Sequence, residues 1–90
     1  MDKIEYKEKG YKSEKYEYDI GVEQSVPPKV SLYYEGKPIC TCIIPIESFI
    51  NEMFDNKTQD SIHFSIDMLK SDVDAGFVDK FIDKYKAKNK

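Results

Sequence analysis

The chain has 90 residues and a formal net charge of −3 at pH 7, and its fourteen basic residues are all lysine. This length makes a single domain with one modest core, and the net charge gives no long-range attraction toward nucleic acid or acidic membranes. Without arginine the chain lacks the planar donor group that holds a phosphate in two places, and a single histidine, His63, excludes multi-histidine metal sites.

We expect a charged N-terminal arm or edge strand in residues 1–15 and a single α+β domain in residues 16–90. The domain begins with large residues that alternate with polar or small ones, which is typical of a half-buried strand. These large residues are Tyr16, Tyr18, Ile20 and Val22. No apolar run approaches the ~20 residues of a membrane helix, and the N-terminus lacks the apolar segment of a secretory signal. We therefore expect a cytoplasmic protein that does not contact a membrane.

The strongest local pattern predicts a β-hairpin. Residues 29–35 and 38–44 are rich in β-branched and aromatic side chains, and Gly36–Lys37 joins them in what we expect to be a type II′ turn. Because neighbouring residues on a strand point to opposite faces, only one of Tyr33 and Tyr34 can face the core. The other is expected to be exposed, or covered by the N-terminal arm, a target protein or a second copy of the chain.

Two amphipathic helices and one more strand are expected after the hairpin. Pro45 suits the first turn of a helix, and an apolar stripe at helical spacing extends that helix to residue 57. Residues 61–68 alternate apolar and polar side chains, which favours a strand, with a helix left open as the alternative. A second helix follows Ser71, with Gly76 inside it and its apolar stripe toward the core. The two stripes are Ile46, Phe49, Ile50, Met53 and Phe54, and then Val73, Phe77, Phe81 and Tyr85, joined by Val78 and Ile82.

The predicted order of elements is therefore β-β-β-α-β-α. No internal repeat or low-complexity segment interrupts this order. We expect an α+β fold in which a small antiparallel sheet of three to four strands has both amphipathic helices packed on one face.

Cys40, Cys42 and His63 are the residues that could carry chemistry. Together they could supply three metal ligands, but the cysteine spacing differs from that of zinc sites. A cysteine with His63 as its base could form a nucleophilic pair, but these cysteines lie in the middle of a predicted strand rather than on an exposed turn. We therefore expect no metal, no cofactor and no enzymatic activity, and we interpret the cysteines as small apolar side chains on a half-buried face.

Charge is distributed unevenly along the second half of the chain. Residues 47–79 carry a net charge of −6, and residues 80–90 carry +4. Because the helices should bury their apolar stripes, the acidic side chains are expected to face water, where they would attract a basic partner surface or simply be solvated. Tyrosines at the hairpin tip add a candidate contact surface. The residues predicted to bind a partner are Tyr33, Tyr34, Glu35, Glu47, Glu52, Asp55 and Asp60.

These observations favour a non-enzymatic protein-binding module. Small size, an acidic stretch and a composition typical of AT-rich coding sequence favour an inhibitor, immunity or anti-defence (anti-CRISPR-like) protein of a phage or mobile element, which blocks a basic surface of a larger enzyme. One alternative is a homodimer that binds or sequesters a nucleotide, with tyrosines stacked on the base and lysines at the phosphates. Another is an accessory protein for single-stranded nucleic acid, based on tyrosines next to lysines, although residues 1–24 carry a net charge of −2.

Overall fold

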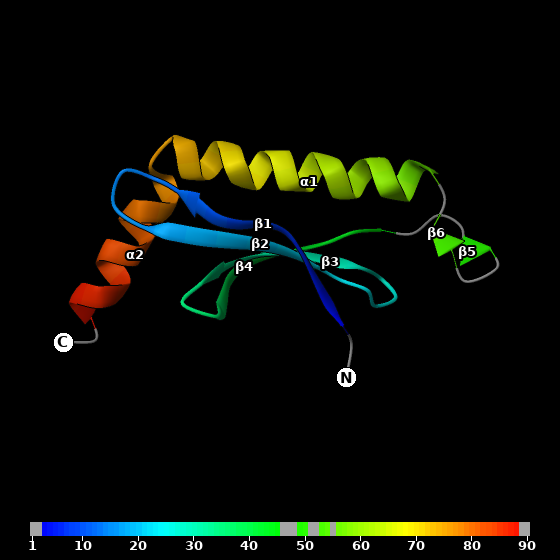
Figure 1. Cartoon of the computed structure of the whole chain (residues 1–90), viewed down its shortest axis with the longest axis horizontal. Helices are drawn as coiled ribbons and strands as arrows, with labels where there is room; N and C mark the ends of the chain where they lie inside the picture. The colour runs from blue at the N-terminus through cyan, green and yellow to red at the C-terminus, as the bar shows by residue number, and fades with distance from the viewer. Residues whose placement is uncertain (1–2, 46–48, 51–52, 55, 89–90) are drawn as a thin grey trace.

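The computed structural model describes residues 3–45, 49–50, 53–54 and 56–88, and it has an α+β fold (Figure 1). Antiparallel strands form a main sheet in chain order, and a short separate sheet follows. The strands of the main sheet are β1 (Ile4–Lys12), β2 (Glu17–Glu23), β3 (Lys29–Tyr34) and β4 (Lys37–Ile43). The short sheet pairs β5 (Phe49–Ile50) with β6 (Met53–Phe54), and the helices α1 (Asn56–Asp74) and α2 (Phe77–Lys88) complete the chain.

The α+β class is confirmed, but the predicted order of elements is wrong because the strands all precede the two helices. The helix predicted from Pro45 to residue 57 is absent from the described part of that segment, where Phe49–Ile50 and Met53–Phe54 are strands. Apolar pairs separated by polar residues occur in short hairpin strands as well as on a helix, so spacing alone could not distinguish the two.

The strand predicted at residues 61–68 is also wrong, because these residues lie inside α1. Phe64 and Met68, which the alternating pattern grouped with the core, are 67% and 44% exposed. The helical alternative is the correct one, since the buried apolar side chains of α1 recur at intervals of three or four. They are Ile62, Ile66, Leu69 and Val73.

Gly76 separates the two helices, whereas the sequence pattern placed it inside one. Its φ of +85° is a left-handed conformation, which favours glycine just after the end of a helix. Its N–H donates to the carbonyl of Val73 at 3.1 Å, and its own carbonyl accepts the N–H of Lys80 at 3.2 Å. One residue therefore ends α1 and lets α2 begin in a new direction.

The β3–β4 hairpin is present, but its turn lies one residue earlier than predicted. Glu35 and Gly36 form the turn with φ values of +51° and +79°, and two positive φ values match the twist of the flanking strands. Leu32 consequently pairs with Cys40. Because a one-residue shift exchanges the faces of a strand, both Cys40 and Cys42 lie on the same face as Leu32.

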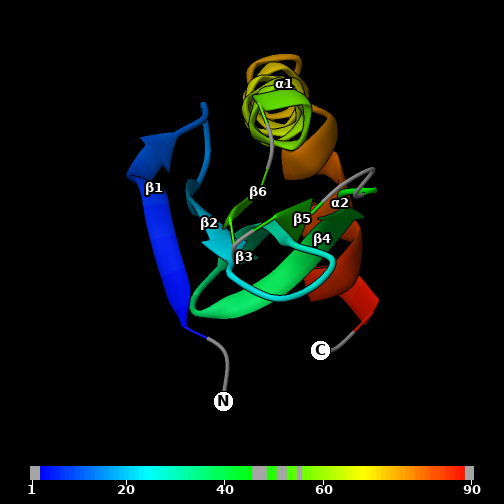
Figure 2. The same cartoon turned by 90° about the vertical axis from the view of Figure 1, so that its right-hand side faces the viewer.

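One hydrophobic core joins the sheet to both helices. Figure 2 looks along α1 and shows the helix above the main sheet, with β1 on one side and α2 on the other. Each large core side chain contributes roughly 1.5–3 kcal/mol through burial. The core residues are Tyr18, Ile20, Val22, Val30, Leu32, Ile44, Ile62, Ile66, Leu69, Val73 and Ile82.

Side chains of the edge strand β1 partly cover the opposite face of the sheet. Tyr33 is only 7% exposed, and the Tyr6 ring packs edge-on against it with 5.5 Å between the centroids. Gly21 lies beneath these rings, and a Cβ atom there would come within 2.9 Å of Cγ2 of Ile4. Of the possible covers for the second tyrosine that the sequence left open, the N-terminal arm is the one that packs on Tyr33.

Candidate functional site

The partner-binding residues predicted from the sequence do not form one surface. Tyr33 is buried, and Tyr34 is half-buried against the ring of Tyr16 at 5.5 Å. Glu35 in the β3–β4 turn and Asp60 near the start of α1 are exposed, but Figure 1 places these two segments at opposite ends of the molecule. Glu47, Glu52 and Asp55 lie outside the described residues.

Two acidic residues of α2 anchor the helix to earlier parts of the chain, and one of them, Asp79, corrects the expectation that the acidic side chains of residues 47–79 face water. Asp79 is 7% exposed and accepts hydrogen bonds from Oγ of Ser13 at 2.6 Å and Oη of Tyr18 at 2.7 Å. Burial, followed by the nearby Asp79 carboxylate, raises the pKa of Tyr18 because both disfavour the phenolate. Asp79 therefore fastens α2 to β2 and to the β1–β2 turn.

Asp83 makes the same kind of attachment one turn later. It accepts a hydrogen bond from Oη of Tyr16 and pairs with Nζ of Lys15 at 2.7 Å. The Lys15 hydrogen bond, then that of Tyr16, lowers the pKa of Asp83. These contacts are side-chain anchors between distant parts of the chain, so neither carboxylate is available to a basic partner.

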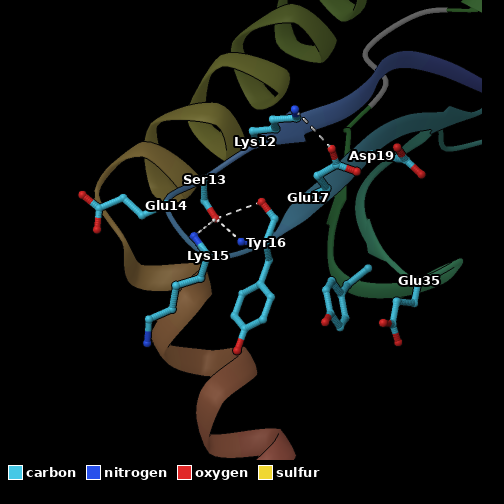
Figure 3. A pocket seen from close by; sticks show the side chains of 9 residues that line it. Lys12, Ser13, Glu14, Lys15, Tyr16, Glu17, Asp19 and Glu35 are labelled. Atoms are coloured by element: carbon cyan, nitrogen blue, oxygen red, sulfur yellow. Dashed lines mark hydrogen bonds and ion pairs between the residues drawn. The ribbon is translucent and has the colours of Figure 1, made fainter.

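A wide cleft of about 620 Å³ lies between the β1–β2 turn and the tip of the hairpin (Figure 3). Its lysines are already engaged, Lys15 with Asp83 at 2.7 Å and Lys12 with Glu17 at 3.8 Å. Carboxylates outnumber lysines around the cleft, and they are Glu14, Glu17, Asp19 and Glu35. An acidic, open cleft is a poor site for the phosphates of a nucleotide.

The residues that could carry chemistry lie apart. Cys40 lines a groove at the β4 side of the molecule, whereas His63 lines a depression beside Glu5 of β1, and β1 and β4 are opposite edges of the sheet. Burial raises the pKa of the Cys40 thiol, which disfavours the nucleophilic thiolate. Among the residues that the structure describes, no group of three or more metal-ligating side chains comes together.

The most distinctive surface is apolar and lies where α2 meets β4. Phe77 and Phe81, one helical turn apart, are 63% and 54% exposed. With Ile39 and Cys40 of β4 they line a groove of about 260 Å³, which Asp72 of α1 also lines. We call Ile39, Cys40, Phe77 and Phe81 the α2–β4 face.

The sequence contained a signal for this face that the first interpretation missed. Apolar residues form a broad band on α2, in which the row of Phe77 and Phe81 runs beside the row of Val78 and Ile82. The sheet need not cover the whole width of such a band. Ile82 is 1% exposed, so the aromatic row, which was expected to be buried, is the one left at the surface.

Comparisons of the chain with protein-family models, curated proteins and solved structures find no match. Within the described ranges, neither helix combines the length and apolar character needed to cross a membrane. Interpretation of the α2–β4 face therefore depends on its own geometry.

Proposed function

We propose that the protein is a non-enzymatic binding module that contacts another protein through the α2–β4 face. The observation that carries this proposal is the exposure of two aromatic rings, Phe77 and Phe81, in one groove. Single exposed apolar residues are common on protein surfaces, but contiguous ones mark interaction sites. Aromatic side chains are also over-represented among the residues that dominate binding energy.

The surroundings of the face support a protein partner over a charged small ligand. The groove is lined mainly by apolar side chains, and Asp72 is its one charged residue. A lysine-lined pocket, which would be needed to hold phosphates without arginine, does not occur at this face. The groove is also open and shallow, so an aliphatic or aromatic side chain from a protein surface fits it better than an enclosed metabolite does.

The narrower hypothesis of a phage-encoded or mobile-element inhibitor that acts on a basic enzyme surface remains a prediction. Asp60, Asp67 and Asp74 recur every seven residues along α1 and are exposed, which provides an acidic stripe for such a contact. Asp74 already accepts hydrogen bonds from Oη of Tyr11 at 2.8 and 3.0 Å. The acidic stripe therefore offers less free negative charge to a partner than its number of aspartates suggests.

The test compares two exposed phenylalanines. Phe77→Ser changes the α2–β4 face, and Phe64→Ser is its matched control because Phe64 is 67% exposed on α1 and does not line the groove. Tagged protein is used to capture partners from cells that express it, and each captured protein is purified and titrated against both variants. The proposal requires a partner whose affinity falls at least about tenfold with Phe77→Ser and not with Phe64→Ser. Equal losses, or no loss, would reject it.

A further inference from the structure

The two edges of the main sheet differ in their protection against pairing with another strand. β1 carries two glutamates and three lysines among its nine residues, and its pairing with β2 has two register shifts. Charged side chains and irregularities of this kind discourage edge-to-edge association. Beyond Pro38, β4 carries no charged residue from Ile39 to Ile43, and no strand among the described residues pairs with its outer edge.

Main-chain groups of β4 point toward that open edge. The N–H of Ile44 donates to the carbonyl of Pro28 at 2.9 Å, so these residues occupy a hydrogen-bonded position of the ladder, at which the proline has no N–H to return a second bond. Such positions alternate along antiparallel strands, which means that Cys42 and Cys40 direct their main-chain groups to β3. The main-chain groups of Thr41 and Ile43, the residues in between, are directed outward.

We propose that the protein forms a symmetric homodimer in which β4 pairs antiparallel with β4 of a second copy. The two-fold axis passes within one residue of Thr41, so that the main sheet continues from one copy into the other. This inference rests on the proposed function, because it names a second copy as the protein bound beside the α2–β4 face.

Self-pairing suits β4 because a two-fold axis brings identical residues together. A charged strand would place like charges opposite one another, as β1 would, whereas Ile39 to Ile43 are uncharged and create no repulsion. Ile43 is 62% exposed and would be covered by the partner strand. The open edge of β4, with the exposed Ile43 side chain beside it, is therefore complementary to the same edge of a second copy.

The exposed aromatic area next to β4 is large enough to contribute substantially to such an interface. At about 200 Å² for a whole aromatic side chain, the exposed parts of Phe77 and Phe81 amount to roughly 230 Å² in each copy. Two copies thus offer nearly half of the roughly 1,000 Å² that a specific interface needs. The paired strands and the Ile43 side chains add to this area.

Pairing within one residue of Thr41 also brings cysteines of the two copies together. Because Cys40 and Cys42 direct their main-chain groups to β3, across the new seam they occupy non-hydrogen-bonded positions, where opposite Cα atoms are about 4.5 Å apart. That separation lies within the range of a disulfide. Within one chain, Cys40 and Cys42 are two residues apart on a strand, at about 6.5–7 Å, which is at the limit of that range.

The first experiment measures mass by light scattering during size-exclusion chromatography over a range of protein concentrations. Wild type should give twice the 10.5 kDa of one chain. Ile43→Lys places two like charges at the seam and should weaken the dimer by at least about 100-fold. Val26→Lys is the matched control because Val26 is 65% exposed and lies in the β2–β3 loop, outside β4, and it should leave the dimer intact.

The second experiment is cross-linking with oxidised glutathione. Two thiols lose two protons and two electrons to it, form one disulfide between chains, and yield two molecules of reduced glutathione. If the axis passes through Cys40, Cys42→Ser still cross-links to itself, and if it passes through Cys42, Cys40→Ser does so. If the axis passes through Thr41, neither variant cross-links alone, and a mixture of the two forms a cross-linked pair.

A wild-type protein that is monomeric at about 100 µM would overturn the homodimer proposal. A dimer that persists in Ile43→Lys would also overturn it, and so would a dimer that gives none of the three cross-linking patterns. The proposed function fails separately, since it depends on affinity for a captured protein being lost in Phe77→Ser and kept in Phe64→Ser. A monomer that retains such a partner would leave the binding module standing and remove only the second copy.

Discussion

Asp79 offers the sharpest test of how α2 is held. Asp79→Ala removes the acceptor of two hydrogen bonds, from Ser13 at 2.6 Å and from Tyr18 at 2.7 Å. Hydrogen bonds to a charged group contribute about 1.5–3 kcal/mol each. The Tyr18 side chain is 1% exposed, so its hydroxyl would lose its acceptor in the core, whereas Ser13 is half-buried and regains water. We expect a loss of about 3 kcal/mol in the free energy of unfolding.

Urea unfolding followed by far-ultraviolet circular dichroism measures this loss. For a chain of this size, a loss of about 3 kcal/mol corresponds to a fall in Tm of roughly 12–24 °C, with an unchanged m value if the folded state stays compact. Asp79→Asn is the control, because it keeps the size and one acceptor oxygen but removes the charge, and it should cost about 1–2 kcal/mol. Using Ile43→Lys as the background for every variant keeps association out of the comparison.

A double-mutant cycle distinguishes this hydrogen bond from general disruption. Tyr18→Phe removes the hydroxyl, so adding Asp79→Ala to it no longer strands a buried donor. The combined loss should fall short of the sum of the single losses by about 1–2 kcal/mol. A loss below 1 kcal/mol for Asp79→Ala, or losses that simply add, would refute the account of Asp79 as the anchor of α2.

Three further predictions concern charge, exposure and space. Because Lys15 and Tyr16 lower the pKa of Asp83 in the folded protein, the stabilisation it provides is complete above the ordinary aspartate pKa of about 3.9 and is lost as pH falls through the lower folded value. The urea midpoints of wild type and Asp83→Asn should therefore differ by a constant amount from pH 7 to 5 and converge as pH falls below that ordinary value. A gap that widens on acidification would contradict this. Phe77→Asp should change the free energy of unfolding of the monomer by less than about 1 kcal/mol, because Phe77 is 63% exposed. Thermal melting at low protein concentration measures this change, and a loss of roughly 3 kcal/mol, as expected for a buried ring, would contradict the prediction. Gly21→Ala should loosen β1, because its Cβ would lie 2.9 Å from Ile4 and 3.3 Å from Tyr6; faster hydrogen exchange in β1, with β4 unchanged as the internal control, is the expected result.

Local patterns sufficed for some elements of the fold. β2 and the β3–β4 hairpin follow from alternation and from a glycine-containing turn, because both features act within a few residues. The register of the hairpin was not predictable to one residue, since Glu35 takes a positive φ of +51° that its residue type does not favour. The α+β class required only the presence of both kinds of element.

Other features depend on contacts between distant segments. Residues 61–68 satisfy a strand pattern and a helix pattern at once, and the choice follows from the packing of Ile62 and Ile66 on the sheet. In the same way, α2 has a broad apolar band, and its packing buries Ile82 while leaving Phe77 and Phe81 exposed. The sequence alone indicates a surface charge at Asp79, and the hydroxyls of Ser13 and Tyr18, 66 and 61 positions earlier, make it an internal anchor.

The attachment of α2 also has a consequence for how the chain is made. Every strand of the main sheet pairs with its neighbour in sequence, so the sheet closes only short loops and can assemble while translation continues. Asp79 and Asp83 contact partners 61 to 68 positions upstream, so α2 docks last. Until the final residues leave the ribosome, the nascent sheet lacks the cover of Ile82, and this interval is when the polypeptide is most exposed to aggregation and to chaperones.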